Sequence, residues 1–172
     1  MTWSAEGRTM RTLLILRHAK ASGGDPDLDD YDRPLNERGR KEAKAVGKLM
    51  RARLPDLVLT SPAVRTRETV ALWQRASRYQ GPIEERREFY LAGPYPYLEA
   101  LAQLGTRAAT TMVVGHNPGL EELVHRLTGR HEVLPPAALA EVELSADSWD
   151  HLARGVAANL VGIRRVKEPN VD

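Results

Sequence analysis

The chain contains no cysteine, and this absence removes several kinds of chemistry. Disulfide bonds, zinc–thiolate sites and a thiol nucleophile are all excluded. No run of apolar residues approaches the ~20 that are needed to cross a bilayer, so no membrane segment is expected. Residues 1–10 are polar and lack the apolar core of a signal peptide. We therefore expect a cytoplasmic protein in which residues 1–10 form a flexible extension.

A strong charge of one sign is missing as well. The 172 residues carry a formal net charge of only +2, and the arginines are scattered along the chain. Both features argue against a nucleic-acid partner. The apolar fraction of 42% and the charged fraction of 28% are those of a globular protein, and we expect one domain over residues 11–172.

Short apolar segments alternate with helical patterns along the chain, and no internal repeat is present. The apolar segments predict strands at 12–16, 56–60, 110–114, 139–144 and 158–166, and a more exposed strand at 83–89. Helices are predicted at 37–53 with Asn36 as N-cap, at 62–78 with Ser61 as N-cap, at 97–104 and at 119–127. This alternation predicts a three-layer α/β/α fold with a mostly parallel central sheet.

Cationic and imidazole side chains follow three of the predicted strands. Arg17 and His18 follow the first, Arg65 lies in the helix after the second, and His116 follows the strand at 110–114. If these strands are parallel neighbours, their carboxyl ends meet at one edge of the sheet. No carboxylate adjoins these residues in the sequence, and the arginine fork matches phosphate oxygens, so the pattern predicts a pocket for a dianion. A histidine among cations stays neutral, which suits attack on a phosphoryl group.

Four sequence blocks resemble those of a known family. They are Leu-Arg-His-Ala-Lys at 16–20, Asp-Arg-Pro-Leu-Asn-Glu-Arg-Gly at 32–39, Thr-Ser-Pro-Ala-Val-Arg-Thr at 60–66 and Val-Gly-His-Asn-Pro-Gly at 114–119. In this order and spacing the chain resembles the histidine phosphatase superfamily, with its phosphoglycerate-mutase-like fold, and most of all the SixA-type phosphohistidine phosphatases. The resemblance implies a hydrolase that removes the phosphoryl group from phosphohistidine on a protein partner, without a metal or other cofactor.

The resemblance also implies a role for each residue at the predicted site. His18 is the nucleophile that becomes phosphorylated, while Arg17 and Arg65 bind the phosphoryl oxygens. His116 completes the pocket and stabilises the transferring group. The residue types agree with these roles, because the transition state spreads charge over three oxygens that preorganised cations stabilise.

The chain departs from the larger members of this family at two points. Ala19 stands where those members carry glycine, which favours the SixA-type branch. Larger members also use a glutamate between the second arginine and the second histidine as general acid. Here that region offers Glu84, Glu85 and Glu88, of which Glu88 is our candidate; the alternative is a solvated, charged strand face. A missing acid would suit phosphohistidine, whose reactive P–N bond breaks without strong acid help.

Three other functions remain open from the sequence. An enzyme of the same fold that acts on small phosphate monoesters would need a positioned acid such as Glu88. A non-catalytic phosphate- or phosphoprotein-binding module would need only the arginines, so His18 and His116 argue against it. A metal hydrolase would need a carboxylate cluster beside these histidines, and the sequence shows none.

Two further residues near the matched blocks are expected in structural roles. We expect Arg33 to form an ion pair with Asp32 or a neighbouring acid of the same loop. Asn117 is expected to cap the helix that follows it.

Overall fold

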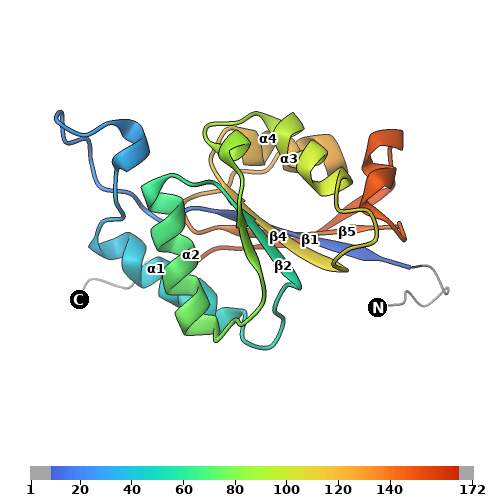
Figure 1. Ribbon diagram of the computed structural model, residues 1–172, viewed down its shortest axis with the longest axis horizontal. Coiled ribbons are helices and arrows are strands. Elements are labelled where there is room, and N and C mark those ends of the chain that lie inside the picture. Colours follow the sequence, from blue (N-terminus) through green and yellow to red (C-terminus); the bar gives the residue numbers. More distant parts are fainter. Residues whose placement is uncertain (1–8, 167–172) are drawn as a thin grey trace.

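The computed structural model of the protein describes residues 9–166 (Figure 1). Within that range six strands form one sheet in the order β3-β2-β4-β1-β5-β6. The strands are β1 (Arg11–Arg17), β2 (Leu57–Thr60), β3 (Ile83–Glu85), β4 (Thr110–Gly115), β5 (Leu139–Leu144) and β6 (Ala158–Arg164). Residues 1–8 of the expected N-terminal extension lie outside the described residues.

The sheet is mostly parallel, which confirms the predicted fold class. β1 pairs with β4, β4 with β2 and β2 with β3, all in parallel. β5 runs antiparallel to β1, and β6 runs antiparallel to β5. Arg17 pairs with Gly115 and Thr60 pairs with Val114. The carboxyl ends of β1, β2 and β4 therefore lie level at one edge of the sheet.

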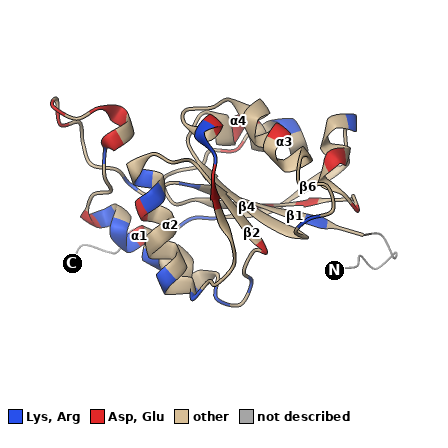
Figure 2. Cartoon of the chain, in the orientation of Figure 1, with Lys and Arg blue, Asp and Glu red and all other residues tan. Residues whose placement is uncertain are grey.

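Helices cover both faces of this sheet (Figure 1). α1 (Glu37–Leu49) and α2 (Val64–Ser77) pack on one face. α3 (Pro94–Ala102), α4 (Gly119–Thr128) and the 3-10 helix η3 (Trp149–Arg154) lie on the other. Figure 2 shows that most charged residues lie on the helices and loops, while the central strands carry few. The result is the predicted arrangement of three layers.

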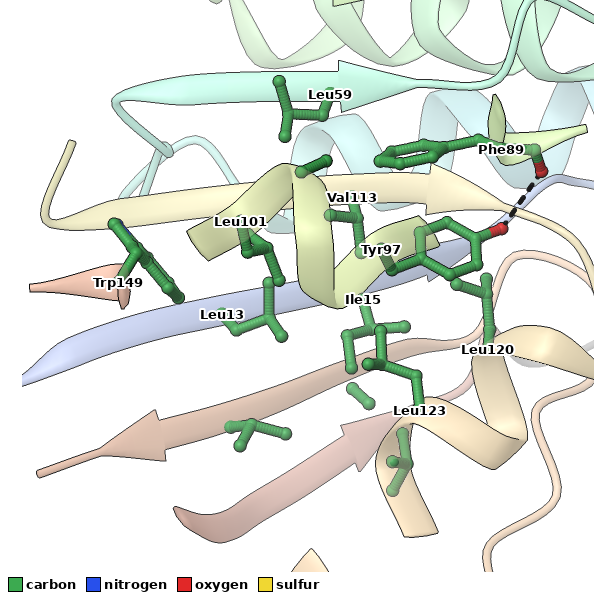
Figure 3. Close-up of a cluster of buried hydrophobic side chains, with 14 of the residues drawn as sticks. Leu13, Ile15, Leu59, Phe89, Tyr97, Leu101, Val113, Leu120, Leu123 and Trp149 are labelled. Atoms are coloured by element: carbon green, nitrogen blue, oxygen red, sulfur yellow. Dashed lines mark hydrogen bonds between the residues drawn. The ribbon is translucent and has the colours of Figure 1, made fainter. Parts of the chain in front are cut away.

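β1 is buried on both faces, and its alternate side chains enter two separate cores. Leu13 and Ile15 belong to the core beneath α3 and α4, which also contains Tyr97 (Figure 3). Leu14 and Leu16 belong to the core beneath α1 and α2. Successive residues of a strand point to opposite faces, so a strand covered on both sides is apolar throughout. This explains the uninterrupted apolar run from which the strand was predicted.

The predicted strand at 83–89 is only partly correct. β3 ends at Glu85, and the 3-10 helix η2 (Arg87–Phe89) follows it. β3 is an edge strand that pairs with β2 alone. The chain then leaves the sheet, and this turn buries the ring of Phe89 completely in the core (Figure 3).

Several helix boundaries also differ from the prediction. α1 ends at Leu49, four residues early, although Asn36 caps its start by accepting the N–H of Gly39 at 2.8 Å. α3 begins at Pro94, three residues early. α2 begins at Val64 with Ala63 as N-cap, because the backbone remains extended there.

Candidate active site

The edge where β1, β2 and β4 end brings the four predicted site residues together. Arg17 is the last residue of β1, and the N–H of His18 donates to the carbonyl of Gly115 at 3.1 Å. The side chains form the wall of a cavity of about 230 Å³, together with the lining residues Lys20, Ala21, Arg33, Leu91, Asn117 and Pro136. The ring centroids of His18 and His116 are 5.3 Å apart. The register of the sheet thus assembles residues that lie far apart in the sequence.

The contacts of His18 determine which ring nitrogen carries the proton. Nδ1 lies 2.8 Å from the carbonyl oxygen of Ala19, which can only accept, so Nδ1 carries the proton. Nε2 then has a lone pair, and Arg65 Nε donates to it at 3.3 Å. Burial, assisted by the nearby His116 and cationic arginines, lowers the pKa of His18 to about 3. His18 is therefore a neutral imidazole at pH 7, with its nucleophilic nitrogen beside a guanidinium.

His116 is held from two sides. Its Nε2 lies 2.7 Å from the hydroxyl of Ser61, and its backbone N–H donates to the hydroxyl of Tyr97 at 3.3 Å. Burial, followed by the charge of Arg65, lowers the pKa of His116 to about 4. Its Nδ1 is buried and has no hydrogen-bond partner within residues 9–166. His116 also lines the cavity, so this fixed, neutral imidazole forms part of the wall that a ligand would contact.

The two arginines bind different parts of the protein. Arg17 donates from Nη1 to the carbonyl of Leu134 at 2.9 Å, while its buried Nε has no partner among the described residues. Arg65 is only 3% exposed. It donates from Nη1 to the backbone carbonyl of Asp30 at 2.6 Å, and from Nη2 to the carboxylate of the same residue at 2.9 Å. Both guanidinium groups are therefore oriented before any ligand binds.

Asp30 and Tyr90 are parts of the site that the sequence analysis missed. Asp30 Oδ2 accepts the hydroxyl of Tyr90 at 2.7 Å, and Oδ1 accepts Nη1 of Arg33 at 3.0 Å. The hydrogen bond from Tyr90, followed by that from Arg65, lowers the pKa of Asp30 to about 2. Arg33 therefore does pair with a loop acid, and its partner is Asp30. No sequence signal distinguishes Asp30 from the four other aspartates of 25–32.

Asn117 does not cap α4, for which Pro118 is the N-cap residue. The amide of Asn117 instead donates to Oε1 of Glu121 at 2.8 Å and to the carbonyl of Leu134 at 2.9 Å. Arg17 donates to this same carbonyl, so Asn117 helps to fix the segment that supports Arg17.

Known proteins match this chain in sequence and in fold. The sequence model of the histidine phosphatase superfamily (branch 1) matches residues 13–90. An uncharacterized protein of Mycobacterium tuberculosis is 38% identical over 160 residues, which cover 86% of this chain and 97% of that protein. The chain belongs to the histidine phosphatase superfamily.

Solved structures relate this histidine phosphatase to the SixA-like branch. A candidate phosphohistidine phosphatase SixA from Agrobacterium tumefaciens is 32% identical, with a TM-score of 0.77 over 91% of this chain and 98% of that one. A mycobacterial glucosyl-3-phosphoglycerate phosphatase shares the fold, with a TM-score of 0.67 over 88% of this chain and 97% of that one, at 13% identity. Proteins of this fold thus include one named as a phosphohistidine phosphatase and one named for a small phosphate ester.

The position of Glu88 bears on whether a carboxylic acid can serve as general acid at this site. Glu88 is exposed on η2 and is not among the residues that line the cavity. Glu84 pairs with Arg86, and Glu85 pairs with Arg67. Within the described part of the chain, no aspartate or glutamate lines the cavity. Glu88 as the acid remains a prediction.

Residues 9–166 contain no group of three or more histidine, aspartate or glutamate side chains arranged to hold a metal ion. No helix in the same range has the length and apolar character that crossing a membrane requires.

Proposed function

We propose that this histidine phosphatase hydrolyses phosphohistidine on a protein partner through a covalent phospho-His18 intermediate. One observation carries the proposal: a neutral, buried His18 presents Nε2 in a cationic cavity whose lining residues include no carboxylic acid. Such a cavity supplies a nucleophile and oxyanion binding but no strong proton donor. That combination suits a substrate whose leaving group departs without one.

The first step transfers the phosphoryl group to the enzyme. Arg65 Nε redirects its hydrogen bond from His18 Nε2 to a phosphoryl oxygen, which releases the Nε2 lone pair to attack phosphorus. The P–N bond of the substrate breaks with its electron pair on the substrate imidazole. Arg17 and Arg65 hold the phosphoryl oxygens, and His116 holds another oxygen as the charge spreads over them in the transition state. The presence of Arg17, Arg65 and His116 in the wall of one cavity with His18 supports this assignment.

The leaving group explains why no carboxylic acid is needed. A substrate imidazole can take a proton from solvent on its second ring nitrogen, so that it leaves as a neutral molecule. The alcohol oxygen of a phosphate monoester has no such second site and requires an acid in the cavity. Asp30 cannot serve at neutral pH, because its lowered pKa of about 2 keeps it ionised. The proposal therefore gives phosphohistidine an advantage over alkyl phosphates.

The second step regenerates the enzyme. Water attacks the phosphorus of phospho-His18, the P–Nε2 bond breaks, and the electron pair returns to Nε2. One water proton remains on the phosphate product, and the other remains there too or passes to solvent. No metal or other cofactor takes part in either proposed step.

The rim of the cavity supports a protein as the carrier of the phosphoryl group. Lys20 and Leu91 line the cavity and are exposed to solvent, Leu91 to 57%. A substrate histidine on the surface of another protein can therefore reach the cavity without a large loop having to open.

Trapping of the phosphoenzyme tests the proposal. The native protein, His18→Ala and the control His125→Ala are mixed with a protein carrying labelled phosphohistidine, with and without a chelator. Alkaline quenching preserves phosphohistidine, and brief acid treatment removes it. We expect an acid-labile label on the native protein and on His125→Ala, no label on His18→Ala, and no effect of the chelator. His125 is a matched control because it is exposed on α4, away from the cavity.

Parallel turnover of a simple phosphate monoester separates the alternatives. Slow monoester turnover beside rapid phosphohistidine turnover supports the proposal. Equal or faster monoester turnover would identify a small-molecule phosphomonoesterase of the same fold. Phosphate binding without labelling or turnover on either substrate would identify a phosphate-binding module.

A further inference from the structure

The guanidinium of Arg65 is bound along two different edges. Its two terminal nitrogens both donate to Asp30, Nη1 to the backbone carbonyl and Nη2 to the carboxylate. Its Nε, on the other side, donates to Nε2 of His18. Asp30 thus occupies the end of the guanidinium and turns the Nε edge toward the nucleophile. This is the edge that must meet the phosphoryl oxygens during attack.

Asp30 is itself fixed by two further residues. Oδ2 also accepts the hydroxyl of Tyr90, and Oδ1 forms an ion pair with Arg33 at 3.0 Å. Asp30 begins a 3-10 helix of three residues, η1 (Asp30–Asp32), in the loop between β1 and α1. Its side chain is 43% exposed and so lies at the outer boundary of the site, behind the nearly fully buried Arg65.

An arginine in this position needs such an anchor. Its long side chain has several freely rotating bonds, and the positive charge of Arg17 is close enough to act on that of Arg65. Transition-state stabilisation depends on donors that already point at the place where charge develops. An ionised carboxylate bonded to the far end of the guanidinium meets both needs, because it restricts rotation and offsets the repulsion.

We propose that Asp30 is a positioning residue that holds the Nε edge of Arg65 toward the phosphoryl group, and that Tyr90 acts through Asp30. The inference rests on the proposed function of Arg65 as a phosphoryl ligand. Asp30 itself touches neither substrate nor phosphorus. Its effect falls on the rate of phosphoryl transfer more than on the stability of the fold.

Tyr90 provides a second, milder way to disturb Asp30. Its ring packs edge-on against Tyr31 at 5.0 Å and against His116 at 5.6 Å between centroids. Tyr90→Phe keeps these ring contacts and removes only the hydroxyl that binds Asp30. Any loss of rate in this variant therefore reports on the orientation of Asp30.

The first test measures kcat, KM and Tm for Asp30→Ala and Asp30→Asn. The matched control is Asp32→Ala, which removes the same charge from an exposed position on the same 3-10 helix. We expect kcat to fall by roughly 10- to 100-fold in Asp30→Ala, less than the 10²–10³ typical of deleting a transition-state donor. Asp30→Asn, which retains an acceptor, should lie between the native protein and Asp30→Ala. A kcat equal to that of Asp32→Ala, with only Tm lowered, would show a purely structural role and overturn the proposal.

The second test is a double-mutant cycle between the two residues. Tyr90→Phe should lower kcat by roughly 3- to 10-fold in the native background and have no further effect on Asp30→Ala, because residues that act through one another are not additive. Multiplicative losses would show that Tyr90 acts independently and would overturn its assigned role.

Binding of inorganic phosphate separates this proposal from the proposed function. Calorimetric titration needs no turnover, so it tests Asp30 even if the protein hydrolyses no phosphohistidine. The native protein and Asp32→Ala, in which Asp30 still positions Arg65, should bind phosphate several-fold more tightly than Asp30→Ala. Tighter phosphate binding by Asp30→Ala would show that Asp30 competes with phosphate for Arg65, and would overturn the proposal. If the native protein forms no phosphoenzyme, the proposed function is refuted. The phosphate-binding comparison between the native protein and Asp30→Ala then still tests the role of Asp30.

Discussion

The two histidines of the cavity are kept neutral chiefly by burial, and this determines how they respond to acid. The pKa of His18 is lowered to about 3 and that of His116 to about 4. A neutral His18 retains its lone pair, and a neutral His116 adds no further positive charge beside it. An ordinary exposed histidine would lose half of its neutral form near pH 6.5.

We expect both cavity histidines to remain neutral well below that pH. In an NMR titration, the imidazole carbon and nitrogen signals of His18 and His116 should keep the shifts of the neutral ring down to about pH 5.5. His18→Gln and His116→Gln assign the two signals. A titration midpoint above about pH 6 for either residue would contradict the assigned electrostatics.

A single substitution also tests whether Glu88 acts as a general acid. If imidazole leaves without acid help, Glu88→Gln should change phosphohistidine turnover by less than about twofold. The informative comparison is the monoester reaction of the same variant. A large loss there would identify Glu88 as an acid for monoesters, whereas an equally large loss on both substrates would contradict acid-free departure of imidazole.

Single residues differed in how well the sequence predicted them. Arg17, His18 and His116 end or follow strands, and Arg65 lies in the first turn of α2, so strand register alone brings them together. Asp30 lies in a loop whose position no periodicity determines. One of five aspartates there binds Arg65, and only the folded chain shows which one.

At the scale of single elements, β4 and α3 meet at a contact that glycine alone allows. A Cβ on Gly115 would lie 2.1 Å from the hydroxyl oxygen of Tyr97. That tyrosine is fully buried, donates to the carbonyl of Phe89 and accepts the N–H of His116. Gly115, the last residue of β4, thus allows Tyr97 to lie close enough to the sheet to support His116.

Gly115→Ala should therefore destabilise the fold by about 1–3 kcal/mol, as overpacking of a core does. Chemical denaturation measures this change, and Gly162→Ala is the matched control, because its strand position has no atom within 4 Å of the added Cβ. Adding Tyr97→Phe should restore part of the lost stability, since the hydroxyl oxygen is the nearest atom. Equal stabilities for the Gly115 and Gly162 variants would disprove the contact.

Helices and strands were predicted best where no tertiary contact competed with the local sequence pattern. Asn36 caps α1 as expected, since its side chain has no competing partner among residues 9–166. Ser61 is not the N-cap of α2, which starts later at Val64, although its hydroxyl accepts the N–H of Ala63 and also pairs with His116. At β3 the burial of Phe89 overrode a strand-like pattern. Errors thus occur where a side chain serves a tertiary contact.

The free energy of unfolding of the whole molecule should depend on pH through the cavity histidines. Below about pH 6.5 an unfolded histidine takes up a proton, whereas His18 and His116 in the fold do not until pH falls to about 3 and 4. The unfolded chain then binds more protons, so stability falls as pH falls through this window.

We expect each of the two histidines to remove roughly 2 kcal/mol of stability between pH 7 and pH 5. Urea denaturation at several pH values measures the loss. His18→Gln and His116→Gln should each show a shallower dependence on pH than the native protein. Identical slopes in all three proteins would show that other groups cause the loss.

The architecture of the whole chain was predictable because helices and strands alternate, which gives layers and a mostly parallel sheet. The directions of β5 and β6 were not predictable in the same way. Periodicity reports which faces of a strand are buried, and it is the same for either direction. Only pairing with β1 fixes β5 as antiparallel.

The segment that leads into this reversed strand supports two residues of the cavity through its main chain. The segment leading into β5 gives the carbonyl of Leu134 to Arg17, the N–H of Ala137 to the carbonyl of His18, and the carbonyl of Ala138 to the N–H of Arg17. The side chains of Leu134, Ala137 and Ala138 are fully buried, and the backbone of Ala137 has a φ of 60°. This segment can therefore hold Arg17 and His18 in place only while its own side chains fit the core.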